Sequence, residues 1–135
     1  MATILLIEDN KANTKLAGLL LRKVGHTLLC AADAETGLTM ARTEHPDLVL
    51  MDIQLPGMDG LAATALLKAD AETAAIPIIA LTALAMKNDQ EKSMLAGCDA
   101  YIAKPLRHQE LFATIDRLLL EAHARGSGGR ERGIP

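Results

Sequence analysis

Five short aliphatic runs recur along the chain, and longer amphipathic segments separate them. The runs cover residues 4–7, 27–31, 48–51, 78–81 and 100–103. Each run is too short for a helix and apolar enough to be buried on both faces, which is typical of strands in a parallel sheet. The alternation of such strands with helix-length segments predicts an α/β fold, a doubly wound sheet with helices on both faces.

The amphipathic segments predict five helices, over residues 11–23, 34–45, 60–70, 86–96 and about 107–124. Asn10 and Asp33 stand where the N-caps of the first two helices are expected. Leu16, Leu19 and Leu20 share one face of the first helix, which predicts that this face packs against the sheet.

The 135 residues include one Tyr, one Phe and no Trp, although half of them are hydrophobic. This length predicts one domain, and the composition gives it an aliphatic core. Functions that stack bases or sugars on aromatic side chains need more rings than these two and are therefore disfavoured. A formal net charge of −3 likewise argues against binding to nucleic acid, which requires a basic surface.

The longest nearly apolar stretch, residues 74–86, is too short to span a bilayer, and the N-terminus lacks the basic residues of a secretory signal. We therefore expect a cytoplasmic protein with no membrane partner. Residues 1–124 are expected to form the domain. Residues 125–135, with four Gly among eleven, are expected to be a flexible tail or the start of a linker. Cys30 and Cys98 have no metal-ligand spacing, so we expect reduced thiols packed as small hydrophobes.

Three acidic residues directly follow predicted strands. Glu8 and Asp9 come after the first strand, and Asp52 comes after the third. The carboxyl ends of parallel strands share one edge of the sheet, where such folds bind their ligands. Because carboxylates held close together repel one another, the cluster calls for a cation, and oxygen ligands without His or Cys suit Mg²⁺. A solvated run of loop acids is the alternative interpretation of Glu8 and Asp9.

Two further residues bring complementary groups to the same edge. Thr82 directly follows the fourth predicted strand and Lys104 directly follows the fifth, so a hydroxyl and an ammonium join the acids. Phosphoryl transfer needs an aligned nucleophile, a metal and positive charge near the phosphoryl oxygens. Asp52 can be that nucleophile, because a carboxylate can form an aspartyl phosphate. The sequence has no P-loop or Gly-rich nucleotide motif, which favours a phosphorylated partner as the donor.

Four segments carry a resemblance to a known family. They are residues 4–10 (ILLIEDN), 47–60 (DLVLMDIQLPGMDG), 78–83 (IIALTA) and 97–105 (GCDAYIAKP). In this order, each at a predicted strand end, they resemble the receiver domain of two-component response regulators. The match extends over about residues 3–122 and is most similar to single-domain cell-cycle receivers and to receivers of hybrid histidine kinases.

The resemblance implies a flavodoxin-like (βα)5 sheet in the order 2-1-3-4-5 and a role for each matching position. Asp52 corresponds to the phosphoacceptor, Asp9 to a direct Mg²⁺ ligand and Glu8 to an acid that acts through water. Gln54 corresponds to the residue that lends a backbone carbonyl to the metal. The remaining matches are Thr82 and Lys104, which contact the phosphoryl group, and Pro105, which follows a cis bond that aims Lys104 inward.

The family also implies a switch and two classes of partner. On phosphorylation the Thr82 hydroxyl moves toward the phosphoryl group, and Tyr101 rotates into the vacated space. The output face is then formed by the fourth helix, the fifth strand and the fifth helix, and it binds a downstream protein. The expected donor is a histidine kinase or a histidine phosphotransfer protein. The domain acts on no separate substrate, and so it is not expected to be an enzyme beyond assisting its own phosphorylation and dephosphorylation.

Three other functions fit all or part of this pattern. A Mg²⁺-dependent phosphohydrolase could use the same aspartyl phosphate, but enzymes of the haloacid dehalogenase type carry a second Asp where this chain has Gln54. A binding adaptor could keep the acidic cluster without ever accepting phosphate. A transcription factor whose DNA-binding half lies outside this sequence would look the same here.

Overall fold

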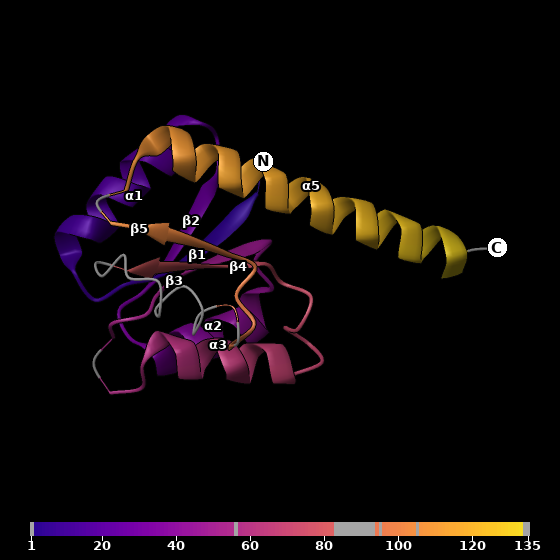
Figure 1. The fold of residues 1–135 in the computed structure, drawn as a ribbon, viewed down its shortest axis with the longest axis horizontal. Helices are drawn as coiled ribbons and strands as arrows, with labels where there is room; N and C mark the ends of the chain where they lie inside the picture. Colours follow the sequence, from indigo (N-terminus) through magenta and orange to yellow (C-terminus); the bar gives the residue numbers. More distant parts are fainter. Residues whose placement is uncertain (1, 56, 83–93, 95, 105, 134–135) are drawn as a thin grey trace.

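The computed structural model describes residues 2–55, 57–82, 94, 96–104 and 106–133. Five parallel strands form one sheet in the order β2-β1-β3-β4-β5, which confirms the expected fold (Figure 1). The strands are β1 (Thr3–Ile7), β2 (Thr27–Ala31), β3 (Leu48–Asp52), β4 (Ile78–Thr82) and β5 (Ala100–Ala103). The helices are α1 (Lys11–Lys23), α2 (Ala34–Glu44), α3 (Gly60–Ala69) and α5 (His108–Gly133). The predicted helix over 86–96 lies, apart from residues 94 and 96, outside the described residues.

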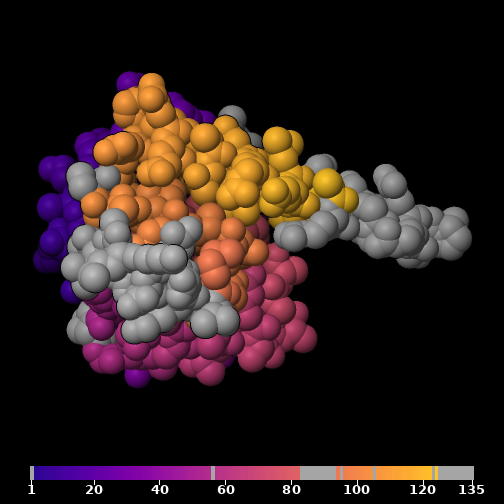
Figure 2. Space-filling view, viewed as in Figure 1, coloured from indigo at the N-terminus to yellow at the C-terminus, as the bar shows by residue number. Residues whose placement is uncertain are grey.

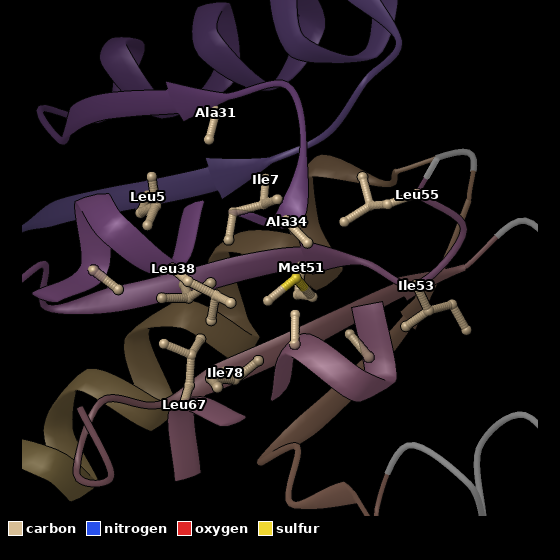
Figure 3. Packing of buried hydrophobic residues seen from close by; sticks show 14 of the residues in the cluster. Leu5, Ile7, Ala31, Ala34, Leu38, Met51, Ile53, Leu55, Leu67 and Ile78 are labelled. Carbon is tan, nitrogen blue, oxygen red and sulfur yellow. The ribbon is translucent and has the colours of Figure 1, made fainter. Parts of the chain in front are cut away.

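Alternate residues of each central strand face opposite layers of helices, as the two-residue period of a strand requires. Leu5, Met51 and Ile78 face α2 and α3, where they pack with Leu38 and Leu67 (Figure 3). The residues on either side of them face α1 and α5 and form a second cluster, which includes Leu6, Leu50, Ile79, Leu21 and Ile115. The sheet is therefore covered on both faces, and its carboxyl edge is left for chemistry.

The N-caps of α1 and α2 are the two residues that the sequence predicts. The side chain of Asn10 accepts a hydrogen bond from the Asn13 N–H at 3.0 Å, and Asp33 accepts one from the Thr36 N–H at 2.7 Å. Such caps satisfy backbone donors that have no partner inside the helix. Because Asn10 and Asp33 come within three residues of the ends of β1 and β2, α1 and α2 begin close to the carboxyl edge of the sheet.

The buried face of α1 differs from the prediction. Leu16 and Leu19 are 44% and 60% exposed, whereas Ala17, Gly18 and Leu21 face the sheet. The physical reason is close approach: a Cβ on Gly18 would lie 3.2 Å from Cδ2 of Leu28 in β2. Small residues let the helix backbone lie against the strands, and Leu16 and Leu19 are turned outward, whereas Leu20 of the predicted face does pack partly against the core.

β2 is less buried than its sequence predicts. It is the edge strand, so only one of its sides is paired, and its residues other than Ala31 are exposed or half-buried. Cys30 is exposed, and the expectation that it packs as a small hydrophobe is wrong. Cys98 is buried, as expected.

α5 continues beyond the predicted helix end near residue 124. Its backbone is helical to Gly133, and its last turns project past the sheet (Figure 1). Gly disfavours a helix by about 1 kcal/mol relative to Ala, which led to the prediction of a non-helical tail. Residues 108–133 contain no proline, however, so no residue blocks the helical path of the backbone. Upstream, the helix lies along one side of the molecule (Figure 2).

Within the described residues, no helix has the length and apolar character needed to cross a bilayer.

Candidate functional site

The carboxyl edge of the sheet brings together residues that follow four strands. Past the strand ends, backbone hydrogen bonds continue the ladder: the Ile53 N–H donates to the Leu81 carbonyl at 3.0 Å, and the Lys104 N–H donates to the Thr82 carbonyl at 2.7 Å. The Glu8 N–H donates to the Ala31 carbonyl at 2.9 Å. The side chains at this edge are therefore held by the sheet itself.

Three carboxylates meet there. Glu8, Asp9 and Asp52 each place an oxygen within 4.8 Å of the others. Glu8 and Asp52 are only 4% and 2% exposed, while Asp9 is open to solvent. The predicted gathering of acids is confirmed. Burial contradicts the interpretation of Glu8 as a solvated loop acid, whereas Asp9 is exposed.

Lys104 lies between the two buried acids. Its ammonium is 2.7 Å from Oε1 of Glu8 and 3.2 Å from Oδ2 of Asp52. The pair with Glu8 is not evident from the sequence, because β1 and β5 are not neighbours in the sheet. Only the length of the lysine side chain lets the ammonium reach across β3 and β4.

The pKa values of these groups follow from their burial and charges. Burial raises the pKa of Glu8, the neighbouring Asp52 carboxylate raises it further, and Lys104 lowers it in part. Burial lowers the pKa of Lys104, but its hydrogen bond to Glu8 and the charge of Asp52 outweigh that effect and leave its pKa above the ordinary value. The lysine is thus held charged between two carboxylates.

The donor set fits a hard divalent cation. In the described part of the chain, Oε2 of Glu8 is buried without a hydrogen-bond partner. A buried carboxylate oxygen is costly unless a cation or donor satisfies it. Three carboxylates and one lysine leave an excess of negative charge, and oxygen ligands of this kind match Mg²⁺.

The raised pKa of Glu8 predicts how stability depends on pH without metal. The folded state binds this proton more tightly, so the stability it contributes is full below the ordinary pKa of 4.5 and is lost as pH rises through the folded pKa. In EDTA, the unfolding free energy of the native protein is therefore expected to fall over this range more than that of Glu8→Gln. The slopes of unfolding free energy against pH should differ between the two proteins by at most about 1.4 kcal/mol per pH unit. Urea titrations across pH 4–8 measure it, and parallel curves for the two proteins would contradict it.

The loop after β3 restrains Asp52 directly. The Gln54 N–H donates to Oδ1 of Asp52 at 3.0 Å, and the Gln54 side chain is exposed. This short turn ties the carboxylate to the backbone two residues later. The predicted metal-binding carbonyl of Gln54 therefore belongs to the same turn as the carboxylate of Asp52.

Thr82 and Tyr101 lie on the same face of the sheet. Thr82 is fully buried at the end of β4, two residues after Ala80, and Ala80 pairs in register with Tyr101 of β5. Residues two apart on a strand point the same way. Tyr101 is half-buried against the cluster that faces α2 and α3. Pro105 lies outside the described residues, so its cis bond stays a prediction.

Comparison with known proteins gives one consistent family. Residues 4–116 match the family model described as the response regulator receiver domain. The chain is 42% identical over 120 residues to the polar-differentiation response regulator DivK of Brucella ovis, covering 89% of this chain and 98% of that protein.

Solved structures agree with this match. The receiver domain of the sensor histidine kinase PA1611 from Pseudomonas aeruginosa, with magnesium coordinated in its active-site cleft, superposes with a TM-score of 0.82 at 36% identity, over 87% of this chain and 97% of that one. A CheY-like receiver domain protein from Methanospirillum hungatei gives 0.84 at 30% identity, over 93% and 98%. The relatives thus include both kinds of receiver that the sequence resembles.

Proposed function

Because the chain belongs to the response regulator receiver domain family, we propose that it accepts a phosphoryl group on Asp52 and passes the signal to another protein. The observation that carries this proposal is the buried carboxylate of Asp52, held 3.2 Å from the Lys104 ammonium beside Glu8 and Asp9. Open α/β sheets bind their ligands at this edge, outside the carboxyl ends of the strands, which is where a phosphoryl donor would reach Asp52.

The proposed donor is the phosphohistidine of a histidine kinase or a histidine phosphotransfer protein. An oxygen of the Asp52 carboxylate attacks phosphorus, the P–N bond to histidine breaks, and the imidazole nitrogen takes up a proton from solvent. An acyl phosphate results on Asp52. Lys104 already contacts Oδ2 of Asp52, so its ammonium can neutralise a phosphoryl oxygen, and the Thr82 hydroxyl can donate to another.

The same edge is proposed to hold Mg²⁺. Asp9, Asp52 and the backbone carbonyl of Gln54 would bind it directly, and Glu8 would bind it through water. The cation supplies charge neutralisation that lets an anionic donor approach the carboxylates. The magnesium reported for the PA1611 receiver supports this assignment, as does the unpartnered oxygen of Glu8.

Residues 1–124 are proposed as the receiver and 125–135 as a tail or linker. The alignment with DivK covers nearly all of that response regulator, which supports an output through protein binding rather than through a separate activity in this domain. The proposed output face is the β5 and α5 surface with the predicted helix 86–96, most of which lies outside the described residues.

Acetyl phosphate and Mg²⁺ test the proposal directly. Incubation is expected to add one phosphate, located at Asp52 by mass spectrometry after borohydride trapping. Absence of that adduct, with the protein folded and Mg²⁺ bound, would leave a binding adaptor as the better description. Multiple turnover of small phosphomonoesters, abolished in Asp52→Asn, would instead indicate a phosphohydrolase.

Tyr101 should report the proposed switch. The chain has one Tyr and no Trp, so tyrosine emission comes from this residue alone. Because Thr82 and Tyr101 share a face of the sheet, beryllofluoride with Mg²⁺ is expected to change that emission. The response should be absent in Asp52→Asn and reduced in Thr82→Ala. An unchanged signal in a protein that demonstrably binds beryllofluoride would contradict the role of Tyr101.

A further inference from the structure

α3 begins directly against the peptide of the proposed phosphoacceptor. The Gly60 N–H donates to the Ile53 carbonyl at 3.2 Å, which closes the loop between β3 and α3. The Asp59 side chain caps the helix by accepting a hydrogen bond from the Ala62 N–H at 2.8 Å. The first turn of α3 is therefore anchored to the residue that follows Asp52.

Gly60 leaves no space for any side chain. A Cβ built on it would lie 2.6 Å from Cα of Ile53 and 2.9 Å from the carbonyl carbon of Asp52, and closer still to the Asp52 carbonyl oxygen. These neighbours are backbone atoms, which cannot swing aside as the end of a side chain can. A larger residue must displace either the helix or the Asp52–Ile53 peptide.

The Gly60 carbonyl has a side-chain hydrogen-bond partner within α3. Thr64 is fully buried, and its hydroxyl donates to the Gly60 carbonyl at 2.8 Å. The Cys98 thiol in turn lies 3.8 Å from the Thr64 oxygen, in the turn that precedes β5. The Gly60 carbonyl is thus bonded within α3, while the Gly60 N–H is bonded to the Ile53 carbonyl just after β3.

We propose that Gly60 is a positioning residue for Asp52, and that the docked start of α3 sets the direction of the Asp52 carboxylate. The inference rests on the proposed function. A shift of the Asp52–Ile53 peptide moves Oδ1 of Asp52 and the Gln54 N–H that donates to it, and with them the turn proposed to bind the metal. A misplacement of about 1 Å at a reacting group can cost about 10²-fold in rate.

Gly18 offers a matched control. It is also a buried helical glycine, but a Cβ there would lie 3.2 Å from Cδ2 of Leu28, the movable end of a side chain. Both Gly→Ala changes add the same methyl group. At Gly18 the added methyl group meets a side chain, whereas at Gly60 it meets the backbone of Asp52 and Ile53.

The experiment compares Gly60→Ala, Gly18→Ala and the native protein at a temperature where circular dichroism shows all three folded. Gly60→Ala is expected to weaken Mg²⁺ binding in calorimetry and to slow labelling by acetyl phosphate, each at least about tenfold. Gly18→Ala should stay within about twofold of the native protein in both measurements. Native-like values in Gly60→Ala would overturn the proposal.

A second pair of variants covers the case in which Gly60→Ala does not fold. Thr64→Val removes the hydroxyl that holds the Gly60 carbonyl, and Thr64→Ser restores it. Slower labelling in the Val variant, recovered in the Ser variant, supports the positioning role, and native-like labelling in Thr64→Val overturns it.

A third readout separates this inference from the proposed function. Amide NMR signals of Ile53 and Gln54 in metal-free protein should shift in Gly60→Ala or Thr64→Val and stay in place in Gly18→Ala. These shifts do not depend on phosphorylation. If the native protein takes up no phosphate, only the proposed function is contradicted. If the Ile53 and Gln54 signals do not shift in Gly60→Ala or Thr64→Val, only the positioning role is contradicted.

Discussion

Asp52→Asn is expected to incorporate no phosphate from acetyl phosphate, while the protein keeps its fold. An amide oxygen is far less nucleophilic than a carboxylate and cannot form the acyl phosphate. The side chain keeps its shape at the end of β3, so the sheet should be unaffected. Mass spectrometry of the intact protein, after incubation with Mg²⁺ and acetyl phosphate, measures the loss.

The matched control is Asp47→Asn. Asp47 stands just before the other end of β3, where its carboxylate accepts a hydrogen bond from the Thr3 N–H at 2.8 Å. The same chemical change there should leave phosphate uptake intact. A phosphate adduct on Asp52→Asn as abundant as on the native protein would show that another residue is the acceptor.

Lys104→Met should destabilise the metal-free protein by about 3 kcal/mol, because it leaves Glu8 and Asp52 buried without their shared cation. Protonation of Glu8 limits the loss, since its pKa is already raised. The variant should still bind Mg²⁺ and should gain more stability from the ion than the native protein does. In this variant, phosphorylation of Asp52 should no longer change the affinity for the downstream partner protein. Urea unfolding in EDTA and in excess Mg²⁺ measures the stability changes.

Lys68→Met is the control for this experiment. Lys68 forms another partly buried ion pair, 3.0 Å from Asp99, and also donates to the Ala74 and Ile76 carbonyls. Its loss should destabilise the protein in EDTA with no added response to Mg²⁺, because the acidic cluster found among the described residues, Glu8, Asp9 and Asp52, lies at Lys104 and not at Lys68. Equal gains from Mg²⁺ in the two variants would show that Lys104 does not compete with the ion.

The fold and the placement of the site residues could be predicted to a large extent from the sequence. Each strand is a short aliphatic run, and each of the first two helices has a cap at the expected position, so local chemistry and topology agree. Asp52, Thr82 and Lys104 could be placed at one edge because they end parallel strands. Such reasoning needs only the order of the elements and the period of the strands.

The features that could not be predicted depend on distances between elements. Leu16 and Leu19 are the larger apolar residues, yet Ala17 and Gly18 decide which face of α1 approaches the sheet. Hydrophobic periodicity counts apolar residues and does not measure how close two backbones can come. The contact between Lys104 and Glu8 was missed for a related reason, because it spans two intervening strands and depends on side-chain reach.

The two cysteines allow local unfolding of the protein to be measured by alkylation. Cys30 is exposed on the edge strand, whereas Cys98 is buried beside Thr64, where burial raises the pKa of its thiol. An alkylating reagent can therefore modify Cys30 in the native state, but it reaches Cys98 only when the turn before β5 opens. Once Cys30 is blocked, the remaining alkylation rate measures that opening, on a timescale set by the stability of this part of the fold.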